Sequence, residues 1–169
     1  MAITRLGGAN AITGTIPNSV LAAGNVIQVV QTVKTDDFST TSTSFTDITG
    51  LSASITPSSS SNKILITASF CSSQGSASQI NMFNLLRGST TIGQPASSQT
   101  YTSTRTQYTY ESGNIDTVHI QLLDSPSTTS ATTYKIQGKC NGGTLGVGNR
   151  PGDNDSEQIS IITLMEVSA

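Results

Sequence analysis

Ile55-Thr-Pro-Ser-Ser-Ser-Ser-Asn-Lys-Ile-Leu-Ile-Thr-Ala-Ser-Phe70 is the stretch that most clearly indicates a fold. Pro57 and the serines after it cannot continue a strand, and Asn62 tolerates the positive φ that a turn often needs. On both sides of this break apolar residues recur at every second position, at Leu51, Ala53 and Ile55 and then at Ile64, Ile66, Ala68 and Phe70. We therefore predict two strands joined by a tight turn, a hairpin with one buried side at the centre of an antiparallel sheet.

Strand-like patterns continue along most of the remaining chain. The clearest segments are Val26–Lys34, Ile80–Arg87, Ile115–Leu123, Thr133–Gln137 and Gln158–Val167, and weaker ones are 45–48, 90–92 and 100–110. Polar or glycine-rich loops, at 36–44 and 138–154 among others, separate these segments, and none of the segments has the periodicity of an amphipathic helix. Eight to ten strands predict an all-β fold, an antiparallel and jelly-roll-like β-sandwich over residues 26–169.

The composition supports strands and indicates an assembly of several chains. Charged residues make up only 11% of the chain, well below the roughly 25% of ordinary soluble domains. Serine and threonine take their place, at about three residues in ten, and suit strands better than helices. Hydrophobic content is 34%, which predicts a modest core. Because Ile80–Leu86 and Ile159–Val167 are apolar on both sides, we expect a homotrimer that buries the second side between subunits.

The first 25 residues differ from the rest of the chain. They are small, nearly uncharged and rich in Gly, Ala and Thr, with isolated apolar residues at Ile3, Leu6, Ile12, Ile16, Val20 and Leu21. Such a segment cannot build a core alone, yet it is too apolar for an ordinary solvated tail. We predict that residues 1–25 form an extended arm that binds another protein surface. A flexible leader is the alternative.

Charge and hydropathy argue against two classes of partner. The formal net charge is −2, and the eight Lys and Arg residues are scattered singly, so no basic patch for nucleic acid is expected. No apolar run approaches the roughly 20 residues that a membrane-spanning helix needs. Glycines and Pro17 interrupt the N-terminal region before the apolar segment of a signal peptide could form.

The sequence contains few groups that could carry catalysis. His119 is the only histidine, and Asp116 and Asp124 lie within reach of it along the chain. A catalytic triad needs its histidine held by an acid and facing a nucleophile, whereas His119 falls mid-strand on a polar side, which indicates a structural residue. One His and two Cys provide no closely spaced zinc ligands. We expect Cys71 and Cys140 to be free thiols in a partly buried setting rather than a disulfide.

One acidic loop resembles a calcium site in part. Asp153, Asp155 and Glu157 alternate, but Gln158 and Leu164 stand where an EF-hand needs Gly and Glu. A solvated acidic loop is the favoured interpretation, and an irregular calcium site is the alternative.

Two further features of the sequence could contact a ligand. Gly143–Gly148 lacks the flanking strand, helix and Lys-Ser/Thr of a phosphate-binding loop, so a flexible loop tip is expected. Tyrosines can stack on sugar rings because they combine an apolar face with a polar tip. The candidates for such contacts with a receptor are Tyr101, Tyr108 and Tyr110, with Tyr134 as a fourth tyrosine that a strand could bury.

Four phrases of the sequence resemble one group of proteins. They are residues 3–17, residues 55–70, Leu123-Asp-Ser-Pro-Ser-Thr-Thr-Ser-Ala-Thr-Thr-Tyr-Lys-Ile-Gln137 and Ile159-Ser-Ile-Ile-Thr-Leu-Met-Glu-Val167. All four are similar to small structural proteins of tailed bacteriophages, particularly those of marine cyanobacteria and related hosts. The resemblance implies a virion protein, either a capsid decoration protein or a head or tail fibre, built as a homotrimer of jelly rolls. It implies no catalytic or ligand residues and no cofactor.

Three functions follow from these observations. In the leading hypothesis the chain is a structural virion protein, with the arm as anchor and the sandwich as the trimeric body. The second is a module that binds a receptor or a host-surface glycan through the tyrosines and the 138–154 loop. An enzyme is the weakest hypothesis, because a glycosidase usually needs two positioned carboxylates and the ten acids here fall mainly in turns and loops.

Overall fold

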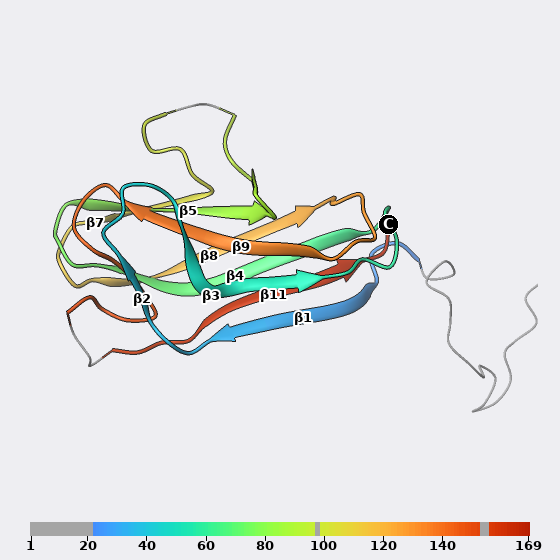
Figure 1. Cartoon of the computed structure of the whole chain (residues 1–169), viewed down its shortest axis with the longest axis horizontal. Coiled ribbons are helices and arrows are strands. Elements are labelled where there is room, and N and C mark those ends of the chain that lie inside the picture. Colours follow the sequence, from blue (N-terminus) through green and yellow to red (C-terminus); the bar gives the residue numbers. More distant parts are fainter. Residues whose placement is uncertain (1–21, 97–98, 153–155) are drawn as a thin grey trace, which may run out of the picture.

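The computed structural model describes residues 22–96, 99–152 and 156–169, which form eleven strands and no helix (Figure 1). In chain order the strands are β1 (Val26–Lys34), β2 (Phe38–Thr40), β3 (Thr46–Ile55), β4 (Lys63–Gln74), β5 (Gln79–Arg87), β6 (Thr90–Ile92), β7 (Arg105–Thr109), β8 (Ile115–Asp124), β9 (Thr132–Cys140), β10 (Leu145–Val147) and β11 (Ser160–Val167). Within these described ranges no helix is long and apolar enough to cross a membrane.

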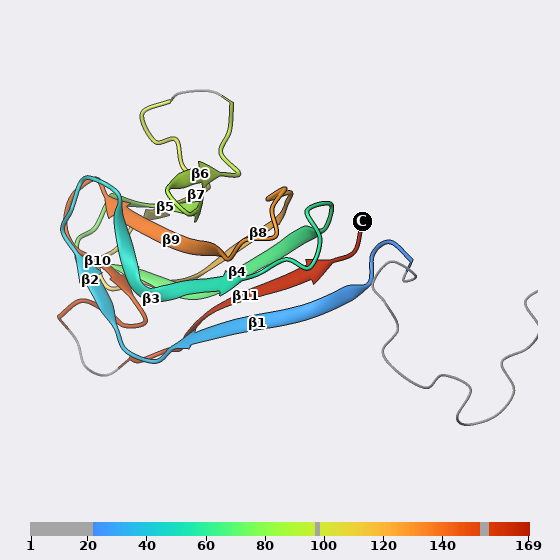
Figure 2. The same ribbon diagram turned by 45° about the vertical axis from the view of Figure 1, so that its right-hand side comes forward.

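The strands form two antiparallel sheets that pack face to face (Figure 2). Sheet A contains β1, β11, β4 and β8 side by side, and β10 and β2 extend it beyond the end of β11. Sheet B contains β3, β9 and β5, with β7 and β6 along the other edge of β5. Among the eight longer strands, the first, eighth, third and sixth form sheet A, and the second, seventh, fourth and fifth form sheet B. This order is that of a jelly roll, so the predicted fold class is confirmed.

The core fills the space between the two sheets. The inward residues predicted on β4 are all buried, namely Ile64, Ile66, Ala68 and Phe70. Phe70 packs edge to face against Phe83 of β5, with ring centroids 5.0 Å apart. Burying each large apolar side chain contributes about 1.5–3 kcal/mol, so this alternation on facing strands is what holds the sheets together.

The predicted hairpin is wrong, although both of its strands exist. β3 pairs with β9 in sheet B, whereas β4 pairs with β8, β11 and β10 in sheet A. The polar turn at 56–62 therefore carries the chain from one sheet to the other. β4 does lie at the centre of its sheet, as predicted. Alternation and a polar break identify two strands, but they do not identify the strands that pair with them.

A buried carboxylate holds this crossover in place. Glu166 of β11 is fully buried, and its Oε1 accepts hydrogen bonds from Ser58 N (2.7 Å), Ser58 Oγ (2.7 Å) and Asn62 Nδ2 (2.6 Å). Its Oε2 accepts one from Gln28 Nε2 of β1 at 2.5 Å. Burial by itself raises the pKa of Glu166, but the bonds from Asn62, Gln28 and Ser58 outweigh burial and hold the pKa below its ordinary value.

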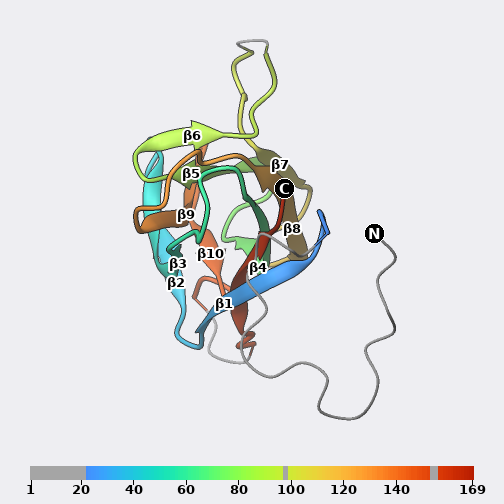
Figure 3. The ribbon, with the colours of Figure 1, turned by 90° about the vertical axis from the view of Figure 1, so that its right-hand side faces the viewer.

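The two ends of the described chain meet beside this carboxylate. Ser168 accepts a backbone hydrogen bond from Gly24 N at 2.8 Å and donates one to Asn25 O at 2.9 Å. Its hydroxyl accepts from Asn25 N and donates to Ala22 O. Figure 3, viewed from this end, shows the C-terminus beside the start of β1. Residues 22–25 are therefore fixed to the sandwich, while the six apolar residues expected to anchor the arm lie outside the described residues.

β1 turns Val29 and Val33 away from the core, whereas Val30 packs against it. Val29 is 56% exposed and Val33 is 45% exposed, whereas Lys34 is buried. The Lys34 ammonium forms an ion pair with Asp36 (2.9 Å) and donates to Asp37 O. Side chains of β1 alternate as the strand-like segment Val26–Lys34 predicts, but Val29 and Val33 lie on the outer side.

β5 is buried on both sides, as predicted, but by its own chain. Met82 and Leu86, which point outward, are at most 4% exposed. Asn84 Oδ1 accepts hydrogen bonds from Gln94 Nε2 (2.9 Å) and Thr104 N (3.3 Å), so the segment between β6 and β7 folds back over this side. β5 therefore gives no support to the predicted trimer.

Two predicted loops contain strands. β2 lies in the expected loop 36–44, and β10 lies in the glycine-rich segment 138–154. All three residues of β10 are fully buried between β4 and β2. A Cβ at Gly146 would lie 2.5 Å from Ser73 Oγ and 2.7 Å from Pro151, so glycine is needed here for close packing. The predicted flexible tip, and the predicted use of this segment as a contact surface, are thus wrong for β10.

Candidate functional site

The outer face of sheet A has an apolar row that crosses four strands. Val29, Met165, Leu65 and Leu123 lie opposite one another on β1, β11, β4 and β8. Val29 and Leu123 are 56% and 50% exposed, and the two central residues are partly exposed. Cross-strand neighbours are about 4.5–5.5 Å apart, so these side chains form one continuous strip.

Two further rows continue this face, and none of the three contains an acidic residue, a lysine or an arginine. The second row is Gln31, Thr163, Thr67 and Gln121, and the third is Val33, Ile161, Ser69 and His119. We call these three rows the A face. Lys63 of β4, opposite Val167, is exposed in the next row on the same side, beyond Leu65. His119 is exposed there on β8, which confirms the predicted position on a polar side of a strand.

The outer face of sheet B has a different character. Lys135, Gln137 and Lys139 alternate along β9 on this side. Asp47 of β3 pairs with Lys135 at 2.7 Å and accepts a hydrogen bond from Gln137 at 2.7 Å, and these contacts lower the pKa of Asp47. The Lys139 ammonium lies 4.6 Å from the centre of the Phe45 ring. The charged side of the sandwich is therefore sheet B, and the A face is the side suited to contact with another protein.

A cavity of about 370 Å³ opens where the edges of the two sheets meet. It is lined by residues 105–108 of β7 and 116–118 of β8, and we call it the β7–β8 cavity. Gln107 Nε2 donates to Asp116 Oδ2 at 2.7 Å across the two edges. Among the described residues, the Arg105 guanidinium has no hydrogen bond or ion pair, and the buried Gln107 Oε1 has no partner.

The tyrosines predicted as receptor contacts divide into two groups. Tyr108 lines the cavity and packs edge to face against Tyr110, with ring centroids 4.7 Å apart, and both are exposed. Tyr101 is also exposed but lies outside the cavity lining. Tyr134 is fully buried. The sequence thus identified Tyr108 but not Arg105, Gln107 or Asp116.

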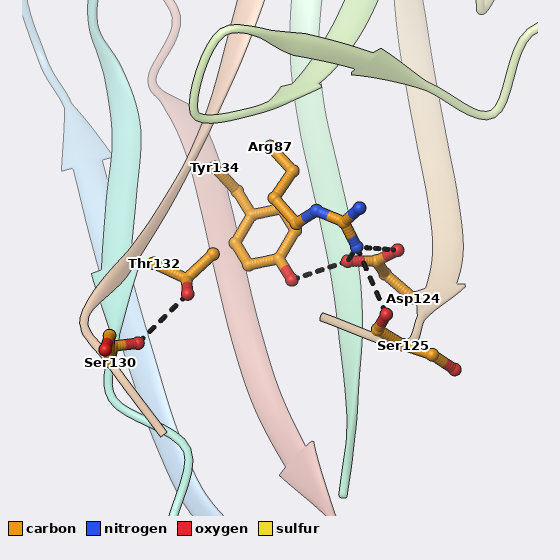
Figure 4. Close-up of polar contacts among 6 residues, drawn as sticks. All are labelled: Arg87, Asp124, Ser125, Ser130, Thr132 and Tyr134. Carbon is orange, nitrogen blue, oxygen red and sulfur yellow. Dashed lines mark hydrogen bonds and ion pairs between the residues drawn. The ribbon is translucent and has the colours of Figure 1, made fainter. Parts of the chain in front are cut away.

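Tyr134 belongs to a polar clamp between the sheets (Figure 4). Its hydroxyl donates to Asp124 Oδ2 at 2.7 Å, and Arg87 Nη1 contacts both Asp124 oxygens at 3.0 and 2.9 Å and donates to Ser125 O. Burial, together with the bond to Asp124, raises the pKa of Tyr134, so the phenol stays protonated. The clamp holds no nucleophile and no free base, and its role is to join β5 and β9 to β8.

The remaining reactive side chains do not gather into a site. Cys71 and Cys140 are both free and buried, as expected, and burial raises the pKa of the Cys71 thiol. In the described part of the chain no three His, Cys, Asp or Glu residues are placed to hold a metal ion. Asp153 and Asp155 of the proposed calcium loop lie outside the described residues, and Glu157 is exposed.

Comparisons with known proteins leave the family open. No family model matches the chain, and no curated protein matches it. Among solved structures, it is similar to the infectious bursal disease virus Gx strain structure, with a TM-score of 0.43, 14% identity and coverage of 93% of this chain and 45% of that chain. It is also similar to the structure of the T13 particle of the same virus, with a TM-score of 0.44, 13% identity and coverage of 86% of this chain and 38% of that chain. For a mutant VP2 protein of that virus in T=1 particles, the TM-score is 0.44 and the identity is 15%, and the match covers 94% of this chain and 40% of that chain.

The chain therefore spans less than half of the solved chains it matches. Identities of 15% or less and TM-scores below 0.5 show no common family or function. The jelly-roll assignment depends on the strand order of the chain itself.

Proposed function

We propose that the chain is a structural protein of a virus particle, of the tailed-bacteriophage type that its sequence resembles, and that it assembles as a homotrimer. The observation that carries this proposal is the A face, where exposed Val29, Val33 and Leu123 lie among uncharged neighbours. An exposed apolar surface of this kind marks an interaction site. A closed cyclic assembly covers the same surface on every subunit. In such a particle the protein serves as a capsid decoration protein or as a head or tail fibre.

We further propose that the arm, residues 1–25, attaches the trimer to the particle. Its last four residues are fixed to the sandwich through Ser168, so the arm leaves from a defined point at one end. An extended segment can add main-chain hydrogen bonds to a sheet edge of a neighbouring virion protein while its apolar residues enter pockets. The residues proposed to do so are Ile3, Leu6, Ile12, Ile16, Val20 and Leu21.

Light scattering of the purified protein tests the oligomer. The expected mass is about three times the 17.5 kDa of one chain. The double variant Val29→Lys/Leu123→Lys should give folded monomers, because it places two charges in the apolar row. Thr133→Lys, at an exposed position of sheet B, is the matched control and should stay trimeric. A wild-type monomer at micromolar concentration, or a double variant that remains trimeric, would refute the proposal.

Truncation tests the arm separately. Deleting residues 1–21 keeps the bonds between residues 22–25 and Ser168, so the melting temperature and the oligomeric mass should not change. Attachment to the larger assembly should be lost, which particle incorporation measures directly. Full occupancy of the truncated protein on particles would place the anchor elsewhere, and an unfolded product would show that the arm belongs to the core.

A further inference from the structure

We propose that the β7–β8 cavity binds a neutral saccharide, a function beyond the structural role. Its volume of about 370 Å³ falls within the range of about 300–1,000 Å³ that small-ligand pockets occupy. The cavity lies at the β8 edge of the sandwich, beyond the third row of the A face, whose His119 follows the lining residue Val118.

The polar groups of the cavity suit hydroxyl groups. Arg105 offers donors that no described residue uses, and Asp116 keeps one carboxylate oxygen free because only Oδ2 accepts from Gln107. A sugar hydroxyl both donates and accepts, so neighbouring hydroxyls can bond to Arg105 and Asp116 together.

The aromatic wall supplies the second element of sugar binding. Tyr108 is 45% exposed, and the edge-on contact with Tyr110, at an angle of 69° between the rings, orients it. Tyr108 alternates with Arg105 and Gln107 along β7, so its ring borders the cavity from the outer side of sheet B, where the apolar face of a pyranose ring can pack on it.

The charges of the cavity select the class of saccharide. The guanidinium of Arg105 and the carboxylate of Asp116 line the same cavity, so their charges balance. A ligand carboxylate would gain from Arg105 but would face Asp116, whereas an uncharged polyol meets no repulsion. We therefore assign the site to neutral, hexose-type sugars.

The location of the cavity fits recognition of a surface outside the particle. Lys63 of β4 pairs with Val167, next to the fixed root of the arm, and Ser72 of the same strand pairs with Asp116. Nine residues of strand at about 3.3 Å each separate these positions by about 30 Å. The cavity thus lies toward the end of the sandwich opposite residues 22–25, and Figure 1 labels β7 at the end away from the C-terminus.

Binding of the full-length protein to an array of neutral hexose-terminated and acidic glycans tests the proposal. We expect binding to neutral glycans, weakened at least about tenfold by Tyr108→Ala and by Arg105→Ala. Tyr101→Ala removes an equally exposed tyrosine outside the cavity and should bind as the wild type does. Light scattering should show an unchanged oligomeric mass for all three variants, which separates this site from the A face.

Three results would overturn the proposal. These are the absence of binding on the array, binding to acidic glycans alone, and neutral-glycan binding that persists in both cavity variants. Circular dichroism of each variant confirms that a loss of binding does not come from unfolding. If Tyr108→Ala is unfolded, Arg105→Ala decides the outcome, because the exposed Arg105 side chain contacts no core residue by hydrogen bond or ion pair.

Discussion

Replacing Glu166 by glutamine should destabilise the fold, because the buried site is built for two acceptor oxygens. If the amide oxygen keeps the bonds from Ser58 and Asn62, the new amide nitrogen faces Gln28 Nε2, and two donors meet. Gln28 can turn its oxygen toward this nitrogen only by giving up its own bond to Thr56 O at 2.7 Å. At least one hydrogen bond to a charged group is lost, a cost of about 1.5–3 kcal/mol. For a domain of this size that lowers the melting temperature by about 3–12 °C.

The same substitution should remove part of the pH dependence of stability. The hydrogen bonds hold the pKa of Glu166 in the folded chain below its ordinary value, which is about 4.3 in an unfolded chain. A lowered folded-state pKa stabilises the protein at pH values above the unfolded pKa, and this contribution is lost as pH falls through the folded pKa. The stabilities of wild type and Glu166→Gln should therefore converge in acid, below about pH 4.

Thermal unfolding followed by circular dichroism at pH 7, 5, 4 and 3 measures both effects. Protein concentration must be held constant, since assembly also raises the apparent melting temperature. Glu157→Gln is the matched control, because Glu157 is exposed, and it should melt within about 1–2 °C of the wild type, as surface substitutions usually do. Equal melting temperatures for wild type and Glu166→Gln at pH 7 would refute this reasoning. So would a difference that persists unchanged at pH 3.

Ile66→Asp should prevent folding, because it places an unpaired charge in the core, and the β-sheet signal in circular dichroism should be absent. A folded Ile66→Asp would show that this core position is misassigned. Gly146→Ala should lower the melting temperature, since its Cβ would lie 2.5 Å from Ser73 Oγ; an unchanged value would show that β10 has room to move. Tyr134→Phe removes one donor from the clamp and should cost about 1 kcal/mol in urea unfolding, whereas no measurable cost would mean that Arg87 alone maintains the clamp.

The strands with strict alternation could be predicted from local sequence, because every second side chain points into the core and is therefore apolar. That holds for β4, where Ile64, Ile66 and Phe70 are all buried. The choice of strand partner could not be predicted in this way. A polar turn such as 56–62 joins two strands equally well within one sheet or between two, and only the pairing with β9 and β11 decides. β10 could not be predicted, because a strand of three residues in a glycine-rich segment is too short to show an alternation of apolar and polar side chains.

In the candidate sites, too, single residues could be predicted from the sequence, but the residues that the fold brings together could not. Tyr108 is conspicuous in the sequence as an aromatic residue among threonines. Arg105, Gln107 and Asp116 are ordinary strand residues until β7 and β8, from different sheets, place them around one cavity. The sequence does carry a signal for the burial of Glu166. This residue follows Ile162 and Leu164 at the same alternation, so an inward acid could have been expected to need buried donors.

The pairing of the first strand with the last has a consequence for biosynthesis. Val26 lies opposite Val167, so β1 leaves the ribosome long before the strand that completes its sheet has been made. Until then β1 and one edge of β4 have unpaired backbone groups, and unpaired edges attract other chains. Contacts this distant in sequence also make folding slow. Loss of the last few residues during synthesis should therefore yield aggregates rather than a shortened jelly roll, and slower production at low temperature should raise the soluble yield.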